Sequence, residues 1–112
     1  MVKRRSKYNN RKTTLHGMTF DSAKEARRYS QLLMLQKAGR IEYLRTQVKF
    51  DLIPTMKHGE KTLRKIVYIA DFVYRDGCVT VVEDSKGFKT DVFKLKLRLF
   101  LQKYPSYEFR IT

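Results

Sequence analysis

The sequence of 112 residues is 42% hydrophobic and carries 25 lysines and arginines against 11 acidic residues, a formal charge of +14. A chain of this length fits one domain with a modest core, and it contains no run of 18 apolar residues that could cross a membrane. One cysteine and two histidines exclude an internal disulfide and a usual structural zinc site, whereas the positive charge indicates a polyanionic partner, with nucleic acid as the first candidate.

Residues 1–12, MVKRRSKYNNRK, are polar and strongly basic. We expect them to form a flexible basic arm that contacts phosphate groups through Lys3, Arg4 and Arg5; a tail that only aids solubility is the alternative. A single folded domain is expected over residues 13–112. Because no apolar run follows the basic residues, we expect no secretory signal and a cytoplasmic location.

The first helix is predicted over residues 20–38, where apolar side chains recur at helical spacing. Ser22 and Glu25 match a capping box near its start, and Gly39 matches a left-handed cap after its end. Glu25 has two alternative roles. Its carboxylate could only cap the helix, or it could add a third acid to a metal site.

Residues 41–53 predict the first strand, or a bent pair of strands, because apolar and polar side chains alternate from Val48 to Leu52. Gln47 is expected to be an ordinary polar residue of the outer face; contact with a nucleic acid or a metal-bound water is the less favoured alternative. The polar segment 55–65 is expected to be a flexible loop.

Residues 66–86 organise the rest of the domain and predict a β-hairpin. Two runs rich in β-branched and aromatic residues flank Asp76-Gly77, a dipeptide that favours a two-residue turn. If these two residues form the turn, Asp71 lies opposite Val82.

Alternation along the paired strands decides which side chains share a face of this hairpin. Asp71, Asp84 and Lys86 fall on one face, and Glu83 and Ser85 fall on the other. The two aspartates become diagonal neighbours that can converge on one divalent cation, with the amine of Lys86 beside them. We therefore expect Glu83→Gln to have only a mild effect on activity. A loop of odd length or a β-bulge would bring Glu83 forward instead.

The segment 90–104 has both an alternating and a helical pattern of apolar residues. Its length and its Leu, Lys, Arg and Gln content favour a helix, which Thr90 or Asp91 can cap. Residues 107–111 predict a last strand that can pair parallel after this crossover. The expected fold is α/β, in the order α-β-β-β-α-β, with a mixed sheet flanked by helices.

Asp71 on one strand, followed by Asp84-Ser85-Lys86 on the next, resembles the signature of the PD-(D/E)XK nuclease superfamily, although Ala70 replaces the proline of its name. The order α-β-β-β-α-β is also the restriction-endonuclease-like core order of these nucleases, so the resemblance covers nearly the whole chain. The segments FDSAKEARRY and VVEDSKGFKT look most like small phage-encoded endonucleases of that group.

The resemblance implies an endonuclease that hydrolyses DNA phosphodiester bonds with Mg²⁺, for which Mn²⁺ would substitute. Oxygen ligands suit such a hard cation. The implied catalytic residues are Asp71, Asp84 and Lys86, and the implied metal ligands are Glu25, Asp71, Asp84 and the carbonyl of Ser85. Lys86 would orient or deprotonate the attacking water, or stabilise the transition state. Contacts with DNA phosphates are expected from basic residues at the N-terminus and around the second helix: Lys3, Arg4, Arg5, Lys89, Lys94, Lys96 and Arg98.

Two other functions stay open at this stage. A Holliday-junction resolvase would act as a homodimer that presents two sites to branched DNA, and no feature of the sequence separates it from a general endonuclease acting on duplex DNA. A catalytically silent DNA-binding protein could use the same fold. The presence of both aspartates and the lysine argues against the silent protein, and no membrane partner is expected.

Overall fold

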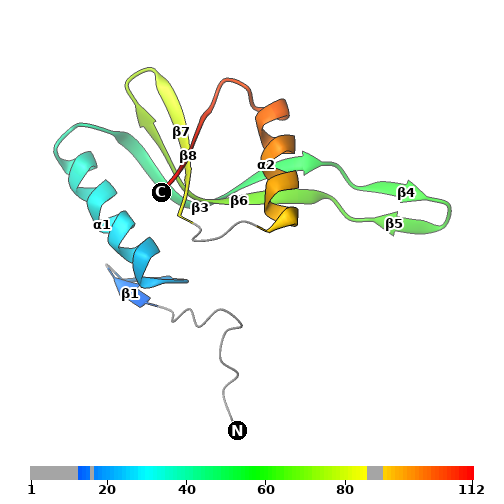
Figure 1. The fold of residues 1–112 in the computed structure, drawn as a ribbon, viewed down its shortest axis with the longest axis horizontal. Helices are drawn as coiled ribbons and strands as arrows, with labels where there is room; N and C mark the ends of the chain where they lie inside the picture. The colour runs from blue at the N-terminus through cyan, green and yellow to red at the C-terminus, as the bar shows by residue number, and fades with distance from the viewer. Residues whose placement is uncertain (1–12, 16, 86–89) are drawn as a thin grey trace, which may run out of the picture.

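The computed structural model describes residues 13–15, 17–85 and 90–112 (Figure 1). Two helices flank a four-stranded mixed sheet. The helices are α1 (Ala23–Lys37) and α2 (Asp91–Lys103). The sheet has the strand order β3-β6-β7-β8, formed by β3 (Glu42–Ile53), β6 (Ile66–Asp76), β7 (Val79–Asp84) and β8 (Glu108–Ile111). The predicted α/β fold is confirmed, and its helices and sheet strands follow the order α-β-β-β-α-β.

Helix α1 begins later than the sequence indicates because the residues before it form a short hairpin. This hairpin consists of β1 (Thr13–Leu15) and β2 (Met18–Phe20). Ser22 is the N-cap, and its hydroxyl accepts a hydrogen bond from the backbone N–H of Glu25 at 3.1 Å. At the other end Gly39, with φ of 75°, donates its N–H to the carbonyl of Gln36. The predicted N-cap at Ser22 and the left-handed glycine after the helix are confirmed.

Helix α2 is the crossover between the last two strands of the sheet. Its N-cap is Thr90, whose hydroxyl accepts a hydrogen bond from the N–H of Phe93 at 3.0 Å. Because a helix separates them, β7 and β8 can run in the same direction, and Val82 lies opposite Phe109 in this parallel pair. The helix and the last strand are both as predicted.

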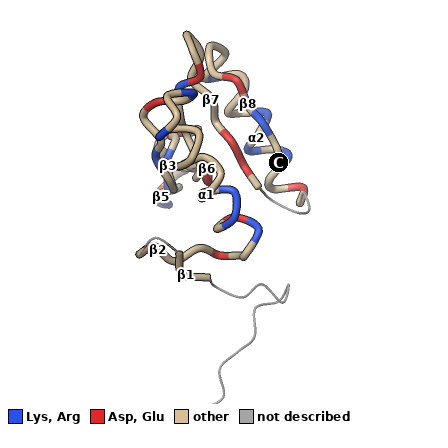
Figure 2. Tube along the Cα trace, turned by 90° about the vertical axis from the view of Figure 1, so that its left-hand side faces the viewer, with Lys and Arg blue, Asp and Glu red and all other residues tan. Residues whose placement is uncertain are grey.

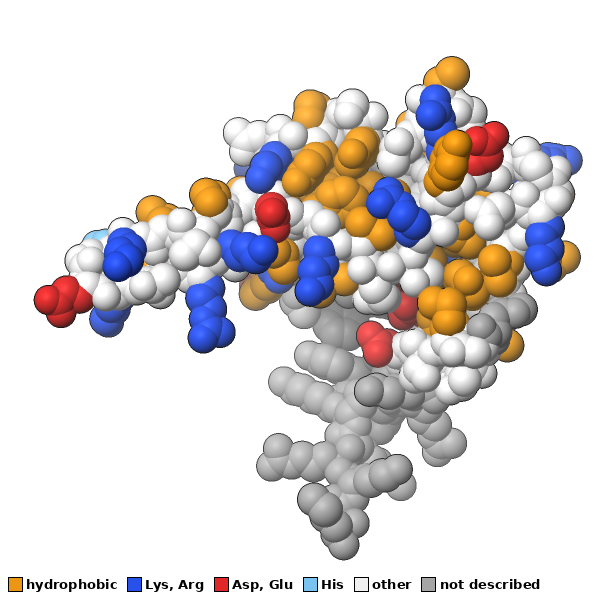
Figure 3. Space-filling view, turned by 180° about the vertical axis from the view of Figure 1, so that it is seen from behind, with side chains coloured by type: hydrophobic (Ala, Val, Ile, Leu, Met, Phe, Trp, Pro, Cys, Tyr) orange, Lys and Arg blue, Asp and Glu red, His pale blue; other side chains and the backbone are white. Residues whose placement is uncertain are grey.

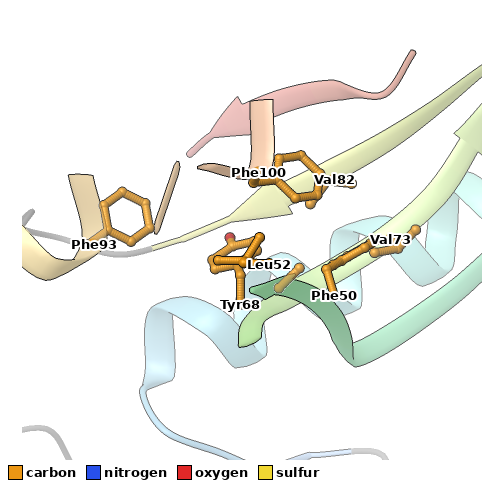
Figure 4. Close-up of a cluster of buried hydrophobic side chains, with 8 residues drawn as sticks. Phe50, Leu52, Tyr68, Val73, Val82, Phe93 and Phe100 are labelled. Carbon is orange, nitrogen blue, oxygen red and sulfur yellow. The ribbon is translucent and has the colours of Figure 1, made fainter. Parts of the chain in front are cut away.

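The sheet has one hydrophobic cluster on each face. Phe93 and Phe100 point from α2 towards side chains of β3, β6 and β7, including Phe50 and Tyr68 (Figure 4). On the opposite face α1 contributes Ala26 and Leu32 to a second cluster, which also contains Phe20 and three residues of the central strands, namely Phe72, Tyr74 and Val81. The two central strands, β6 and β7, are therefore buried on both faces along much of their length.

The hairpin of β6 and β7 has a different register from the one predicted. Asp76 pairs with Val79, which places Gly77 and Cys78 in the two-residue turn, and Val82 lies opposite Val73. Gly77 has φ of 64°, which suits the first central position of such a turn. The predicted turn was one residue too early. Each β6 residue therefore pairs with a β7 residue two positions later than predicted. A shift of two positions leaves each β7 side chain on the predicted face of the sheet.

The segment predicted as a flexible loop is a second β-ribbon. It consists of β4 (Met56–His58) and β5 (Lys61–Leu63), which pair antiparallel, and it projects from the end of β3 and β6 beyond α2 (Figure 1). Gly59 has φ of 63° and allows the tight turn at its tip. The polar composition of this segment reflects exposure to solvent and does not indicate irregular structure.

Candidate functional site

Asp71 and Asp84 lie next to each other on the two central strands. The last regular pair between β6 and β7 joins Phe72 and Glu83, so the residues that come next along the two strands are Asp71 and Asp84. Figure 2 shows the acidic end of β7, in red, a short tan stretch before the grey segment. Each aspartate thus lies one residue beyond the last pair, and Ser85, the residue after Asp84, donates hydrogen bonds to Asp71, so the two acids are close together at the end of the hairpin pairing.

Ser85 fixes the carboxylate of Asp71. Its backbone N–H donates a hydrogen bond to Oδ2 of Asp71 at 2.9 Å, and its hydroxyl donates a second to the same oxygen at 3.0 Å. Asp71 is 8% exposed and Ser85 is 6% exposed. The two donors therefore hold the Asp71 side chain in one orientation at the end of β7.

Tyr68 holds the other aspartate. Its hydroxyl donates a hydrogen bond to Oδ2 of Asp84 at 2.6 Å, and Asp84 is fully buried. Burial, followed by this hydrogen bond and by the negative charges of Asp84 and Asp71, raises the pKa of Tyr68. Tyr68 therefore stays a protonated donor.

Glu25 contacts the site region through Gln47. Oε1 of the buried Glu25 accepts a hydrogen bond from the side-chain amide of Gln47 at 3.0 Å. On β3, Gln47 sits between Thr46, which pairs with Phe72, and Val48, which pairs with Ala70. It therefore lies opposite Asp71, so Gln47 joins the start of α1 to the strand that carries Asp71.

The regular alternation of side chains between the two faces of the sheet is interrupted at Gln47 and Asp71. On β6, Ala70 packs in the cluster beneath α2, whereas Phe72 packs in the cluster beneath α1 although it is two residues further on. Regular alternation would put both on one face. Gln47 has φ of 52°, in the left-handed region that a glutamine seldom adopts. The candidate site is therefore at a break in the pleat. Gln47 is exposed, as expected for a polar residue of the outer face, and its hydrogen bond to Glu25 is the contact that the sequence did not predict.

Glu83 faces away from the aspartates and holds β7 to α1. Both of its carboxylate oxygens accept hydrogen bonds from Arg28, at 2.6 Å from Nε and 2.9 Å from Nη2, and Tyr74 donates a third at 2.7 Å. Burial, and then the bond to Glu83, raise the pKa of Tyr74. The prediction that Glu83 and Asp84 point to opposite faces is confirmed. The ion pair itself was missed, because nothing in the sequence pairs Arg28 with a residue 55 positions later.

The candidate basic residues are divided between described and undescribed segments. On α2, Lys94 and Arg98 are exposed and Lys96 is half-buried. Residues 1–12, predicted as a basic arm with three candidate phosphate contacts, lie outside the described residues, and so do Lys86 and Lys89.

The family described as protein of unknown function DUF1064 matches residues 5–112, which is nearly the entire sequence. The chain belongs to this family. No curated protein and no solved structure matches the chain. Within the described part of this DUF1064 protein, neither helix is long and apolar enough to cross a membrane.

The donor set of this DUF1064 protein fits a hard cation held partly by water. Asp71 and Asp84 supply carboxylate oxygens, which Mg²⁺ prefers, and Mg²⁺ is commonly bound by only one or two protein carboxylates. The bonds from Ser85 use only Oδ2 of Asp71. Among residues 13–15, 17–85 and 90–112, no three His, Cys, Asp or Glu side chains are grouped so that they could hold a metal. Asp71 and Asp84 are therefore the two predicted ligands on which a cation site would rest within the described residues.

Proposed function

We propose that this protein is a metal-dependent DNA endonuclease that resembles the PD-(D/E)XK superfamily. The observation that carries the proposal is the pair of buried aspartates at adjacent positions of the central strands, in a chain with a formal charge of +14. Two buried carboxylates side by side repel each other and would also repel a nucleic acid. A bound cation between protein and phosphate removes both difficulties.

The fold supports the proposal through the placement of this pair. The sheet and its two helices have the order α-β-β-β-α-β expected for such a nuclease, and β8 pairs parallel to β7. Of the residues that resemble the nuclease signature, Asp71 lies on β6 and Asp84 is the last residue of β7. Lys86 follows Ser85 directly in the sequence.

The chain's own residues would position the reacting groups. Bound Mg²⁺ would stabilise charge on the phosphate and help to generate hydroxide near neutral pH. Asp71 and Asp84 would hold it, because Ser85 and Tyr68 already fix the orientation of their carboxylates. Lys86 would orient or deprotonate the attacking water. The Ser85 carbonyl and Glu25 remain proposed additional ligands, and exposed cations such as Lys94 and Arg98 would contact flanking phosphates.

A cleavage assay on several DNA forms tests the proposal. End-labelled linear duplex, single strand and four-way junction would be incubated with Mg²⁺, Mn²⁺ or EDTA, using wild type and Asp71→Asn. Asp51→Asn is the matched control, because Asp51 is an exposed acid on the neighbouring strand β3.

We expect metal-dependent cutting by wild type and Asp51→Asn, and a loss of at least about 100-fold in Asp71→Asn with DNA binding retained. Preference for the junction, together with a dimeric protein, would select the resolvase. Binding without cutting under any metal would contradict the proposal and favour a catalytically silent DNA-binding protein.

A further inference from the structure

The ribbon formed by β4 and β5 is a basic projection with no hydrophobic core. Every residue from 54 to 66 is exposed. Its one apolar cross-strand pair, Met56 with Leu63, is 53% and 45% exposed. An isolated two-stranded ribbon gains little stability from its own contacts. The residues of the ribbon are therefore better explained by contact with a binding partner than by the stability of the ribbon itself.

The charge of the ribbon indicates a polyanion. It contains the cations Lys57, Lys61, Arg64 and Lys65, and Glu60 at the tip is the one acid between residues 54 and 66. Figure 3, seen from behind, shows blue side chains along this projection at the left of the molecule and a red one at its tip. The ammonium of Lys65 lies 3.8 Å from Asp51, which leaves three of these cations without an ion pair within the described residues.

The cations occupy both faces of the ribbon. Lys57 pairs with Thr62, and His58 pairs with Lys61 at the next position, so Lys57 and Lys61 point to opposite faces. A surface that lies flat on a polyanion needs cations on one face only. Cations on both faces are suited to a groove with phosphates along both walls.

We propose that the β4–β5 ribbon inserts into the major groove of duplex DNA beside the cleavage site. Two strands about 4.8 Å apart fit a groove about 12 Å wide. The ribbon continues β3 and β6, which carry Gln47 and Asp71, so its tip lies roughly 35 Å along the strand from Asp71 at about 3.3 Å per residue. This is about one helical turn of DNA. The inference rests on the proposed nuclease function for its choice of ligand.

Duplex binding in EDTA tests the ribbon independently of cleavage. The test variant is the triple Lys57→Gln, Lys61→Gln, Arg64→Gln. The control triple removes the same charge, from two lysines and one arginine, at exposed positions near the ends of the helices: Lys37→Gln, Arg40→Gln and Lys103→Gln. Fluorescent duplexes of about 10 and about 25 base pairs and a single strand of the longer length would be titrated at several salt concentrations.

For the long duplex we expect the ribbon triple to bind about tenfold more weakly, with a slope of log K against log[salt] shallower by about 2 to 3. Wild type and the control triple should prefer the long duplex over the short one, and the ribbon triple should lose that preference. As a second variant, Glu60→Gln should tighten binding to the long duplex only, because it removes the acid at the tip.

Three results would overturn the inference: equal losses in the two triples, an unchanged salt slope in the ribbon triple, or an equal effect on single strand and duplex. Failure of the nuclease proposal is distinguishable from these, because it would leave the binding differences in EDTA intact while no metal supports cutting.

Discussion

At the residue scale, the ion pair between Arg28 and Glu83 sets how β7 is held against α1. Arg28→Ala would leave the fully buried Glu83 carboxylate without its cation. We expect the free energy of unfolding to fall by about 3 kcal/mol, as for other broken buried pairs. Arg27→Ala, at the exposed arginine next to it, should change the value by less than about 0.5 kcal/mol. Urea unfolding of the three proteins measures both.

The same pair revises the expectation for Glu83 itself. The sequence alone favoured a mild effect of Glu83→Gln on activity and made no prediction for stability, whereas the structure gives this carboxylate two bonds from Arg28 and one from Tyr74. We now expect a clear loss of stability. If Arg28→Ala and Arg27→Ala unfold at the same urea concentration, the ion pair does not hold β7 to α1.

Tyr68 should make stability depend on pH in the alkaline range. Burial and the bond to Asp84 raise its pKa above the ordinary tyrosine value, which is about 10. A group whose pKa is higher in the folded state stabilises the fold below the unfolded-state pKa, and this contribution decreases as the pH rises further. Tyr68→Phe should therefore lie about 2 kcal/mol below wild type at pH 7, and the difference should shrink above about pH 10.

Chemical unfolding at pH values from 7 to 11 measures this difference. Tyr43→Phe, at a tyrosine that is 69% exposed, should stay within about 0.5 kcal/mol of wild type at pH 7. A difference between Tyr68→Phe and wild type that stays constant into the alkaline range would contradict the assigned role of the Tyr68 hydroxyl.

At the element scale, the start of α2 depends on Thr90. This helix follows the candidate site directly in the chain, and the Thr90 hydroxyl accepts from the N–H of Phe93. Thr90→Ala should lower the free energy of unfolding by about 1 kcal/mol, whereas Thr90→Ser should have little effect. Equal unfolding midpoints for Thr90→Ala and wild type would show that the cap is not needed.

The helices and the order of the strands were predictable because their signals are local. Ser22 and Gly39 mark the ends of α1 by hydrogen bonds to residues within one turn, and Thr90 does the same for α2. The parallel pairing of β8 followed from the helical crossover before it. The sequence also predicted that Asp71 and Asp84 lie close together. This held because moving the β6–β7 pairing by two residues does not change the face of the sheet to which a β7 side chain points.

The remaining details of the site depend on contacts between distant residues. Gln47 adopts a left-handed φ opposite Asp71, and no residue type at that position signals it. Arg28 and Glu83 meet only after α1 has packed on the sheet. The turn was misplaced because Asp76-Gly77 suits a turn by composition, whereas pairing along the whole hairpin places Gly77 first in it. Such features require the tertiary structure.

At the scale of the whole molecule, acids are few and two of them are buried together within a strongly basic chain. A cation that binds the folded protein should relieve their repulsion and raise its thermal midpoint. We expect millimolar Mg²⁺ or Mn²⁺ to raise the melting temperature of wild type and of Asp51→Asn by a few degrees. Asp71→Asn should respond less. Differential scanning fluorimetry measures these melting temperatures. Equal shifts in all three proteins would show that the cation binds at a site that does not include Asp71.

The most direct measurement of the nuclease account is the cutting of covalently closed circular duplex DNA, which has no ends for an exonuclease. Wild type, Asp84→Asn and the control Asp51→Asn would be compared in Mg²⁺ and in EDTA, after circular dichroism has shown that all three are folded. The account predicts nicked or linear product with Mg²⁺ from wild type and Asp51→Asn, none in EDTA, and at least about 100-fold less from Asp84→Asn. Intact circles with wild type, or equal cutting by folded Asp84→Asn, would contradict it.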